Sequence, residues 1–185
     1  MRAAALAILF ATACAPGSFD APDDYAFDVS DAVYWRASDT GDPGTDGSII
    51  VLLSDRDGLC DAFTRGAFEG DHALLGLQAL SGSSDQPADT GTYDVGAAAR
   101  RAIVRRMQSD GSCRTPAEIA EAASGTLTID QAPGDAFDDV EGSFSGRMGD
   151  AEVTARFSAT YCAAGATALN GQVRTLRFRS CSEGQ

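Results

Sequence analysis

Five cysteines are the residues of this chain with the clearest chemistry. Cys60, Cys113, Cys162 and Cys181 are spread over the chain, whereas Cys14 stands near its start. In an exported chain, an even number of scattered cysteines is typical of disulfides, so we expect these four to form two bridges. Zinc is the alternative, but zinc sites use closely spaced Cys or Cys/His pairs, and the chain has a single histidine. No metal is expected at the cysteines.

Four cysteines allow three pairings, and the sequence alone does not choose among them. We expect Cys162 to pair with Cys181 and Cys60 with Cys113, because each pair would join neighbouring parts of the chain. Each bridge should contribute on the order of 2–4 kcal/mol, mainly by restricting the unfolded chain.

The acidic segment SDTGDPGTDGS offers a candidate ligand site in Asp39, Asp42 and Asp46. Their carboxylates, among flexible glycines, could supply oxygens to Ca²⁺, which takes six to eight of them. The spacing of three and four residues differs from the EF-hand order. A hairpin loop with solvated charges is therefore the favoured interpretation, with calcium as the alternative, and GDAFDDVEG over 134–142 is a second candidate. No cofactor is expected.

Catalytic patterns yield no assigned catalytic residue. A Ser-His-Asp triad would require His72, but no serine lies in a G-x-S-x-G motif, and GSFSG places Phe144 where the nucleophile belongs. Asp138, Asp139 and Glu141 could supply the two carboxylates of a glycosidase. These acids lie in Gly- and Pro-rich turns, where solvated side chains are the better interpretation. The chain has no P-loop or dinucleotide fingerprint.

The first 14 residues, MRAAALAILFATAC, have the layout of an export signal. Arg2 precedes an apolar run over 3–12, and this run of about ten residues is too short to span a bilayer. Small residues before Cys14 resemble the signal of bacterial lipoproteins, although Ala11 stands where leucine is usual. The resemblance implies that Cys14 carries a diacylglycerol thioether and an N-acyl chain, which anchor the protein to a membrane. The alternative is a secretory signal cut after Ala13, and both predict export.

The export signal divides the chain into a signal peptide over 1–13, a tether over 14–24 and a single β domain over 25–185. The tether is rich in Pro, Gly and Asp, so we expect it to be mobile. Ala15 follows the cysteine, and in resemblance to lipoprotein sorting in Gram-negative bacteria this residue favours the outer membrane over inner-membrane retention.

The charge of the chain excludes one class of partner. Loss of Arg2 with the signal leaves 14 − 1 = 13 basic residues against 27 acidic ones, a net charge of −14. Such a charge keeps an exported domain soluble and repels nucleic acid and anionic surfaces. We expect no nucleic-acid partner.

Most of the chain has the pattern of β-strands. In SGTLTID, Leu127 and Ile129 alternate with Thr126 and Thr128, as in a half-buried antiparallel strand. Gly149-Asp150 is suited to a two-residue type II′ hairpin. The expected strands cover 26–36, 48–53, 73–80, 93–95, 102–107, 124–130, 140–148, 151–162 and 173–178.

Two segments need a choice between helix and strand. Residues 59–68 place apolar residues at helical spacing and predict a short helix. AAARRAIVRRMQ over 97–108 has good helix propensity, but its alternation favours a strand in a chain dominated by strands. The expected fold is all-β, an antiparallel β-sandwich or barrel-like sheet with one or two short helices.

The order of several short motifs resembles uncharacterised exported lipoproteins of Gram-negative bacteria. The resemblance implies a compact, disulfide-bonded β domain and carries over no catalytic residue. The motifs are LSD over 53–55 with Cys60, GTY over 91–93, SGTLTI over 124–129, GSF over 142–144 and the strand from Phe157 to Cys162.

Two classes of function agree with these patterns. The first is a lipid-anchored, non-enzymatic binding module whose partner is an envelope protein, a peptidoglycan element or a small ligand. The second is a hydrolase that acts on envelope polymers through a carboxylate pair. Acids gathered in one concavity would favour the hydrolase, and scattered acids the binding module. We favour binding because no catalytic constellation is visible in the sequence.

Overall fold

The computed structural model describes residues 15–37, 47–65, 70–81, 87–96, 99–110, 117–133 and 138–168. These residues form nine strands and two short helices. The elements are β1 (Gly17–Asp20), β2 (Asp31–Arg36), β3 (Ile49–Ser54), α1 (Leu59–Arg65), β4 (Asp71–Leu80), β5 (Gly91–Val95), β6 (Arg101–Asp110), β7 (Ala117–Gln131), β8 (Val140–Met148), β9 (Ala151–Tyr161) and α2 (Ala163–Ala168).

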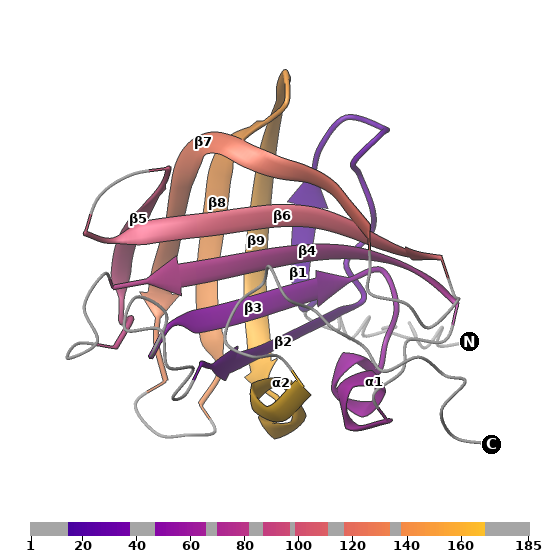
Figure 1. Ribbon diagram of the computed structural model, residues 1–185, viewed down its shortest axis with the longest axis vertical. Coiled ribbons are helices and arrows are strands. Elements are labelled where there is room, and N and C mark those ends of the chain that lie inside the picture. The colour runs from indigo at the N-terminus through magenta and orange to yellow at the C-terminus, as the bar shows by residue number, and fades with distance from the viewer. Residues whose placement is uncertain are drawn as a thin grey trace, which may run out of the picture.

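The strands close into a barrel (Figure 1). Around the ring, the order is β9-β2-β3-β4-β6-β5-β7-β8, and the pairing of β8 with β9 completes it. β1 adds to the wall beside β9, which is its only pairing partner among the described strands. Most pairs are antiparallel, while β2 with β9 and β5 with β6 are parallel. The expected all-β, barrel-like fold is confirmed.

Two walls of the barrel cross each other. Figure 1 shows β2, β3, β4 and β6 running across the front, with β8, β9 and β1 running behind them at a steep angle. β7 bends from one wall into the other, and its register with β8 shifts between Ala122 and Ser124. Gly125 follows with a φ of 142°, and a Cβ there would lie 2.6 Å from the Cα of Gly146. A bulge and a glycine are the usual means of turning such a corner.

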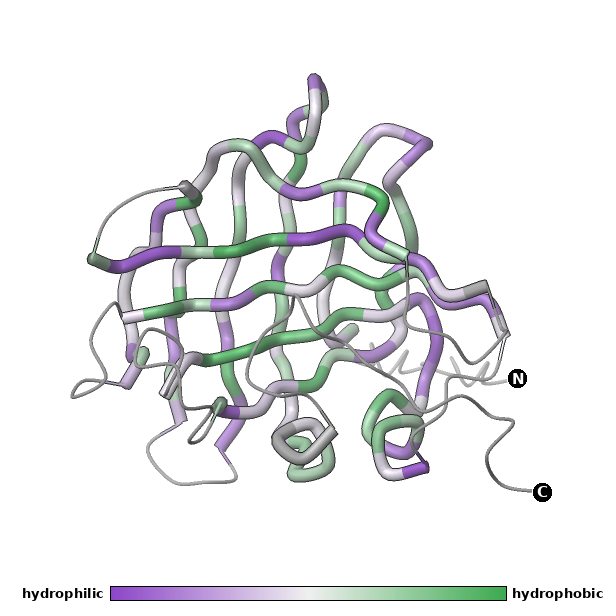
Figure 2. The backbone as a smooth tube through the Cα atoms, viewed as in Figure 1, coloured by the Kyte–Doolittle hydropathy of each residue, from purple (hydrophilic) through white to green (hydrophobic). Residues whose placement is uncertain are grey.

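The barrel interior is filled by the inward-facing side chains of the alternating strands. Along β9, Val153, Ala155, Phe157 and Ala159 are buried, whereas Thr154, Arg156 and Thr160 are exposed. Figure 2 shows the same alternation of hydropathy along β8 and β9. The largest interior side chains are Tyr34, Tyr93 and Phe144, together with leucines and isoleucines of β3, β4 and β7.

A second apolar core lies outside the front wall, between this wall and the two helices. β3 is buried on both faces, which explains the continuous apolar run IIVLL over 49–53 (Figure 2). Trp35 packs edge-on against Phe63 of α1, with ring centroids 5.3 Å apart. Gly165 of α2 lies so close to the Trp35 ring that a Cβ there would be 2.6 Å from Cδ2. Among the described residues, no helix is both long and apolar enough to cross a bilayer.

Most expected elements are confirmed, including the strand interpretation of 97–108, which corresponds to β6. The expected helix over 59–68 is observed as α1, and Gly149 has the positive φ, 56°, that a primed hairpin turn requires. The expected strand over 173–178 lies outside the described residues. α2 had no counterpart in the sequence analysis.

The expectation of a mobile tether over 14–24 needs a correction. Residues Gly17–Asp20 form β1, which is paired residue for residue with Thr154–Phe157 of β9. Phe19 is buried in the barrel core and packs against Phe27, with ring centroids 5.2 Å apart. One buried aromatic side chain and a paired backbone outweigh the polar composition of the segment.

Candidate functional site

Several residues singled out by the sequence lie outside the described part of the structure. Within the described residues, no group of three or more His, Cys, Asp or Glu side chains could hold a metal ion. The candidates that lie outside the described part of the structure are the lipidation candidate Cys14, the calcium candidates Asp39, Asp42 and Asp46, and the cysteines Cys113 and Cys181.

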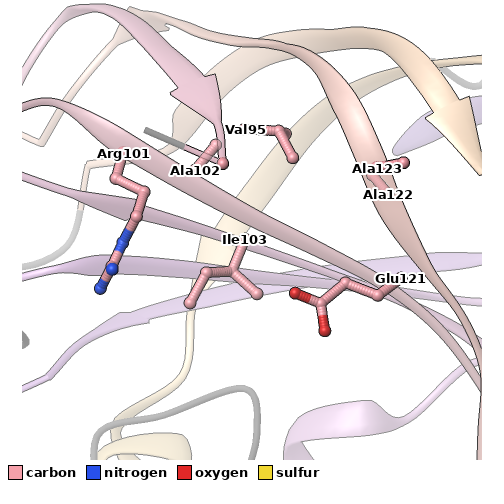
Figure 3. A pocket seen from close by; sticks show the side chains of 8 residues that line it. Val95, Arg101, Ala102, Ile103, Glu121, Ala122 and Ala123 are labelled. Carbon is pink, nitrogen blue, oxygen red and sulfur yellow. The ribbon is translucent and has the colours of Figure 1, made fainter. Parts of the chain in front are cut away.

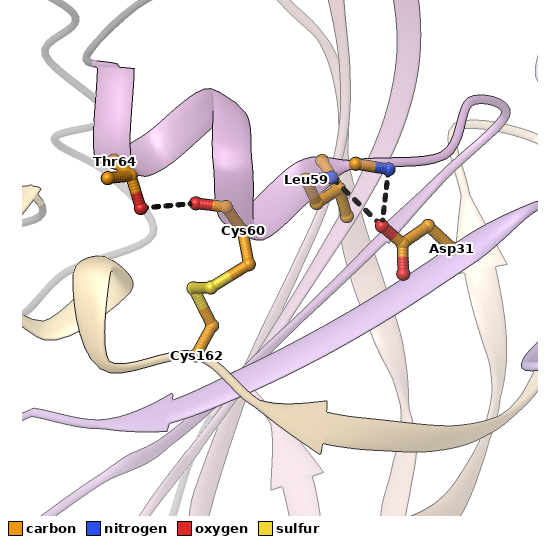
Figure 4. The surroundings of a disulfide bond; sticks show 6 residues. Asp31, Leu59, Cys60, Thr64 and Cys162 are labelled. Carbon is orange, nitrogen blue, oxygen red and sulfur yellow. Dashed lines mark hydrogen bonds between the residues drawn. A yellow bond between two sulfur atoms is a disulfide. The ribbon is translucent and has the colours of Figure 1, made fainter.

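The structure corrects the expected cysteine pairing. Cys60 is bonded to Cys162, with their Cα atoms 5.6 Å apart, so neither cysteine can pair with Cys113 or Cys181 (Figure 4). Cys60 lies in the first turn of α1, and Cys162 directly follows β9. The parallel pairing of β2 with β9 brings the two segments together, because α1 packs beside β2. The expected pairs assumed that neighbours in the sequence would be neighbours in space.

Asp31 positions the helix that carries Cys60. Its Oδ2 accepts hydrogen bonds from the backbone N–H groups of Gly58 and Leu59, both at 2.9 Å (Figure 4). These groups belong to the start of α1, where N–H donors lack partners within the helix. The cap therefore comes from β2, 27 residues earlier in the chain, rather than from a residue next to the helix.

His72 lies in β4 with its side chain buried beside Ser54 of β3. The Ser54 Oγ and the His72 Nδ1 are 3.5 Å apart, and Ser54 Oγ also accepts a hydrogen bond from the backbone N–H of Arg56. A serine nucleophile has to reach a substrate, but Ser54 is 0% exposed. This burial supports a structural role for His72.

The carboxylate candidates Asp138, Asp139 and Glu141 are exposed side chains at the start of β8. The backbone carbonyl of Asp138 accepts a hydrogen bond of 2.6 Å from the buried Tyr34 hydroxyl. Burial raises the pKa of Tyr34 above its ordinary value, while the nearby Arg36 lowers it. Asp138 is thus held through its backbone carbonyl, and its carboxylate lies at the surface.

Arg106 is a buried cation that points toward the N-terminal segment at one end of the barrel. Its Nε donates to the carbonyl oxygen of Tyr25 at 2.9 Å, its Nη1 donates to the carbonyl of Met107, and its guanidinium lies 4.9 Å from the ring centroid of Phe27. Burial lowers the pKa of Arg106, and Asp55 opposes this effect. These contacts hold residues 25–27 against the barrel, so we assign Arg106 a structural role.

The barrel wall has an opening where β5, β6 and β7 meet (Figure 3). The opening contains a cavity of about 180 Å³. For comparison, a cavity of about 150 Å³ in another protein accommodates benzene. The lining residues are Val95, Gly96, Arg101, Ala102, Ile103, Glu121, Ala122 and Ala123.

The strand register explains the opening. β6 and β7 pair from Arg105 and Glu121 onward, whereas β5 pairs with β7 only from Thr126. Over 122–125, β7 therefore has a strand partner on its β8 edge but none on the edge facing β6. Ala122 and Ala123 of this stretch line the cavity, and their short side chains leave it unfilled.

Two charged side chains, Arg101 and Glu121, lie at opposite ends of the opening. In Figure 3, Ile103 lies between them. Glu121 and Glu118 both form ion pairs with Arg105, so Glu121 is held in place. The floor consists of Ala102 and Ala122, which belong to the barrel core. The exposed lining of the opening is more polar than apolar, so the arrangement offers charged and hydrogen-bonding groups above a floor of two alanines.

The sequence analysis missed this site because its residues are not chemically distinctive. The signal in the sequence is the run AEAAS over 120–124, where a strand of a filled barrel would be expected to carry bulky side chains. Comparison with protein-family models, with curated proteins and with solved structures finds no match to this chain.

Proposed function

We propose that this protein is an exported, lipid-anchored, non-enzymatic binding module that takes a small polar ligand at the opening between β5, β6 and β7. The observation that carries the proposal is the opening itself. It is a cavity of about 180 Å³ in the wall of a barrel whose interior is filled by large side chains. A ligand therefore binds in the wall of this barrel rather than inside it.

Export and lipid attachment are supported by the first 14 residues and by the chemistry of the cysteines. The signal ends in small residues before Cys14, the position that carries the lipid in bacterial lipoproteins. The Cys60–Cys162 disulfide agrees with an oxidising compartment. The resemblance favours the outer membrane.

The placement of the carboxylates favours binding over hydrolysis. Glycoside hydrolysis needs two carboxyl groups on either side of one bond, one of them protonated in an apolar environment. Of the described residues that line the opening, Glu121 is the single acidic one, and it is paired with Arg105. Asp20 and Asp28 do line one shallow hollow beside β1, but both are exposed to water.

Binding at the opening can be tested by ligand-observed NMR with a set of small polar compounds, including amino acids, amino sugars and dicarboxylates. The variant Ala123→Phe would place a ring in the opening. Ala117→Phe is the matched control, because both alanines are exposed residues of β7 and Ala117 lies outside the cavity.

The proposal predicts at least one compound whose saturation-transfer signal is lost in Ala123→Phe and kept in Ala117→Phe. Far-UV circular dichroism of both variants should match that of the wild type. Compounds that bind all three proteins equally, or none, would contradict a site at the opening.

A further inference from the structure

We propose that the wall formed by β8, β9 and β1 is the membrane-facing surface of this protein, and that the opening between β5, β6 and β7 points away from the bilayer. This inference rests on the proposed lipid attachment at Cys14. It adds an orientation, which lipid attachment alone does not give.

The length of chain between the anchor and the barrel carries the first step. β1 begins at Gly17, so only Ala15 and Pro16 separate it from Cys14. Three residue steps span at most about 11 Å even when fully extended. Because β1 is paired with β9 over all four of its residues, the barrel cannot move far from the lipid.

The pairing of β9 determines where the chain leaves the wall. The carbonyl of Pro16 accepts a hydrogen bond of 2.8 Å from the backbone N–H of Ser158. Beyond this point, the same edge of β9 is occupied by β2, which pairs with Thr160 and Tyr161. This edge of β9 therefore has no room for a longer β1, and an acyl group on Cys14, two residues before Pro16, would lie beside the β9–β1 wall.

The outer surface of this wall suits lipid headgroups. A shallow hollow of about 400 Å³ lies across β1, β8 and β9, where short hydroxyl side chains stand beside one cation and one acid. The strand register sets Ser143, Arg156 and Ser18 in one row across the three strands. Guanidinium and hydroxyl groups bind phosphate and glycerol oxygens, while no large apolar side chain projects from these three strands. The surface thus fits a zwitterionic headgroup layer without insertion into the acyl chains.

The ring of strands places the opening on the other side of the barrel. From β9, the path to β5 passes β8 and β7, and the path to β6 passes β2, β3 and β4. Figure 1 agrees, with β5 at the left of the front and β1 behind at the right. An anchor beside β1 therefore leaves the opening accessible from the aqueous side.

The orientation can be measured on the full-length acylated protein in vesicles of phosphatidylethanolamine and phosphatidylcholine. An amino acid with an azide side chain is introduced at Thr160 or at Thr92. A polarity-sensitive fluorophore is then attached to the azide. Both are exposed threonines in strands, Thr160 on β9 and Thr92 on β5. Lipids brominated near the headgroup act as the quencher.

We expect quenching at position 160 to be at least threefold stronger than at position 92. Twelve Gly/Ser residues inserted between Ala15 and Pro16 should remove the difference, because such a linker has an average reach of about 20 Å. Equal quenching in the acylated protein, or stronger quenching at position 92, overturns the orientation alone. An N-terminal peptide without the mass of the lipid overturns the orientation together with the proposed anchor.

Discussion

Cys60 and Cys162 are 102 residues apart in the sequence and covalently joined in the structure. The bond connects the first turn of α1 to the end of β9, and α2 begins at the next residue. Helices of seven and six residues are too short to be stable alone, so packing on the outer wall and this bond hold them in place. The disulfide therefore holds in place the two helices that cover the second core, and Trp35 belongs to this core.

Loss of this disulfide should destabilise the protein. A bridge that closes a loop of about 100 residues restricts the unfolded chain strongly, and a loss on the order of 3–5 kcal/mol is expected. In urea unfolding, Cys60→Ser and Cys162→Ser should lower the free energy of unfolding by similar amounts. The double variant should lower it no further than either single variant. Peptide mapping under non-reducing conditions should recover the peptides of Cys60 and Cys162 joined. Either cysteine found joined to Cys113 or Cys181 would refute the pairing.

Asp31→Ala should weaken the start of α1. The substitution removes the acceptor of two backbone N–H groups, and loss of a helix N-cap costs about 1 kcal/mol. The free energy of unfolding in urea checks this value. Asp28→Ala is the control, because Asp28 is an exposed residue shortly before β2. Equal effects of the two substitutions would mean that the cap contributes nothing specific.

Tyr34 should make the protein less stable at alkaline pH. Burial raises its pKa above the ordinary value of 10.0, so the folded state keeps the phenolic proton that the unfolded state releases. The resulting stability is present below pH 10.0 and is lost as the pH rises through the folded-state pKa.

The comparison of wild type with Tyr34→Phe isolates this effect. The variant should lose about 1 kcal/mol at pH 8, because the hydrogen bond to the Asp138 carbonyl is gone. Between pH 9 and 11, its free energy of unfolding should fall less steeply than that of the wild type. Parallel curves for wild type and Tyr34→Phe would contradict the assignment.

Much of the barrel could be predicted from local patterns. The late strands β7, β8 and β9 alternate because one face is buried and the other solvated, and β3 is apolar throughout because α1 and α2 cover its outer side. β1 could not be predicted in this way. Its backbone pairing with β9 depends on barrel closure, which no property of the residues GSFD expresses.

The candidate site and the disulfide depend on long-range geometry in the same way. Ala122 and Ala123 matter because β5 separates β6 from β7 beside them, and their sequence indicates only an ordinary strand. Cys60 and Cys162 meet because β2 lies parallel to β9. Such contacts are set by the order of strands around the ring, which composition and periodicity do not determine.

The central claim, a barrel held at a membrane through Cys14, is tested most directly by cell fractionation in a Gram-negative host. The wild-type protein and Cys14→Ser are expressed at equal levels, and the membrane and soluble exported fractions are compared by immunoblot. The account predicts that the wild type is found in the membrane fraction and that Cys14→Ser moves to the soluble exported fraction. Equal distribution of the two proteins between these fractions would contradict it.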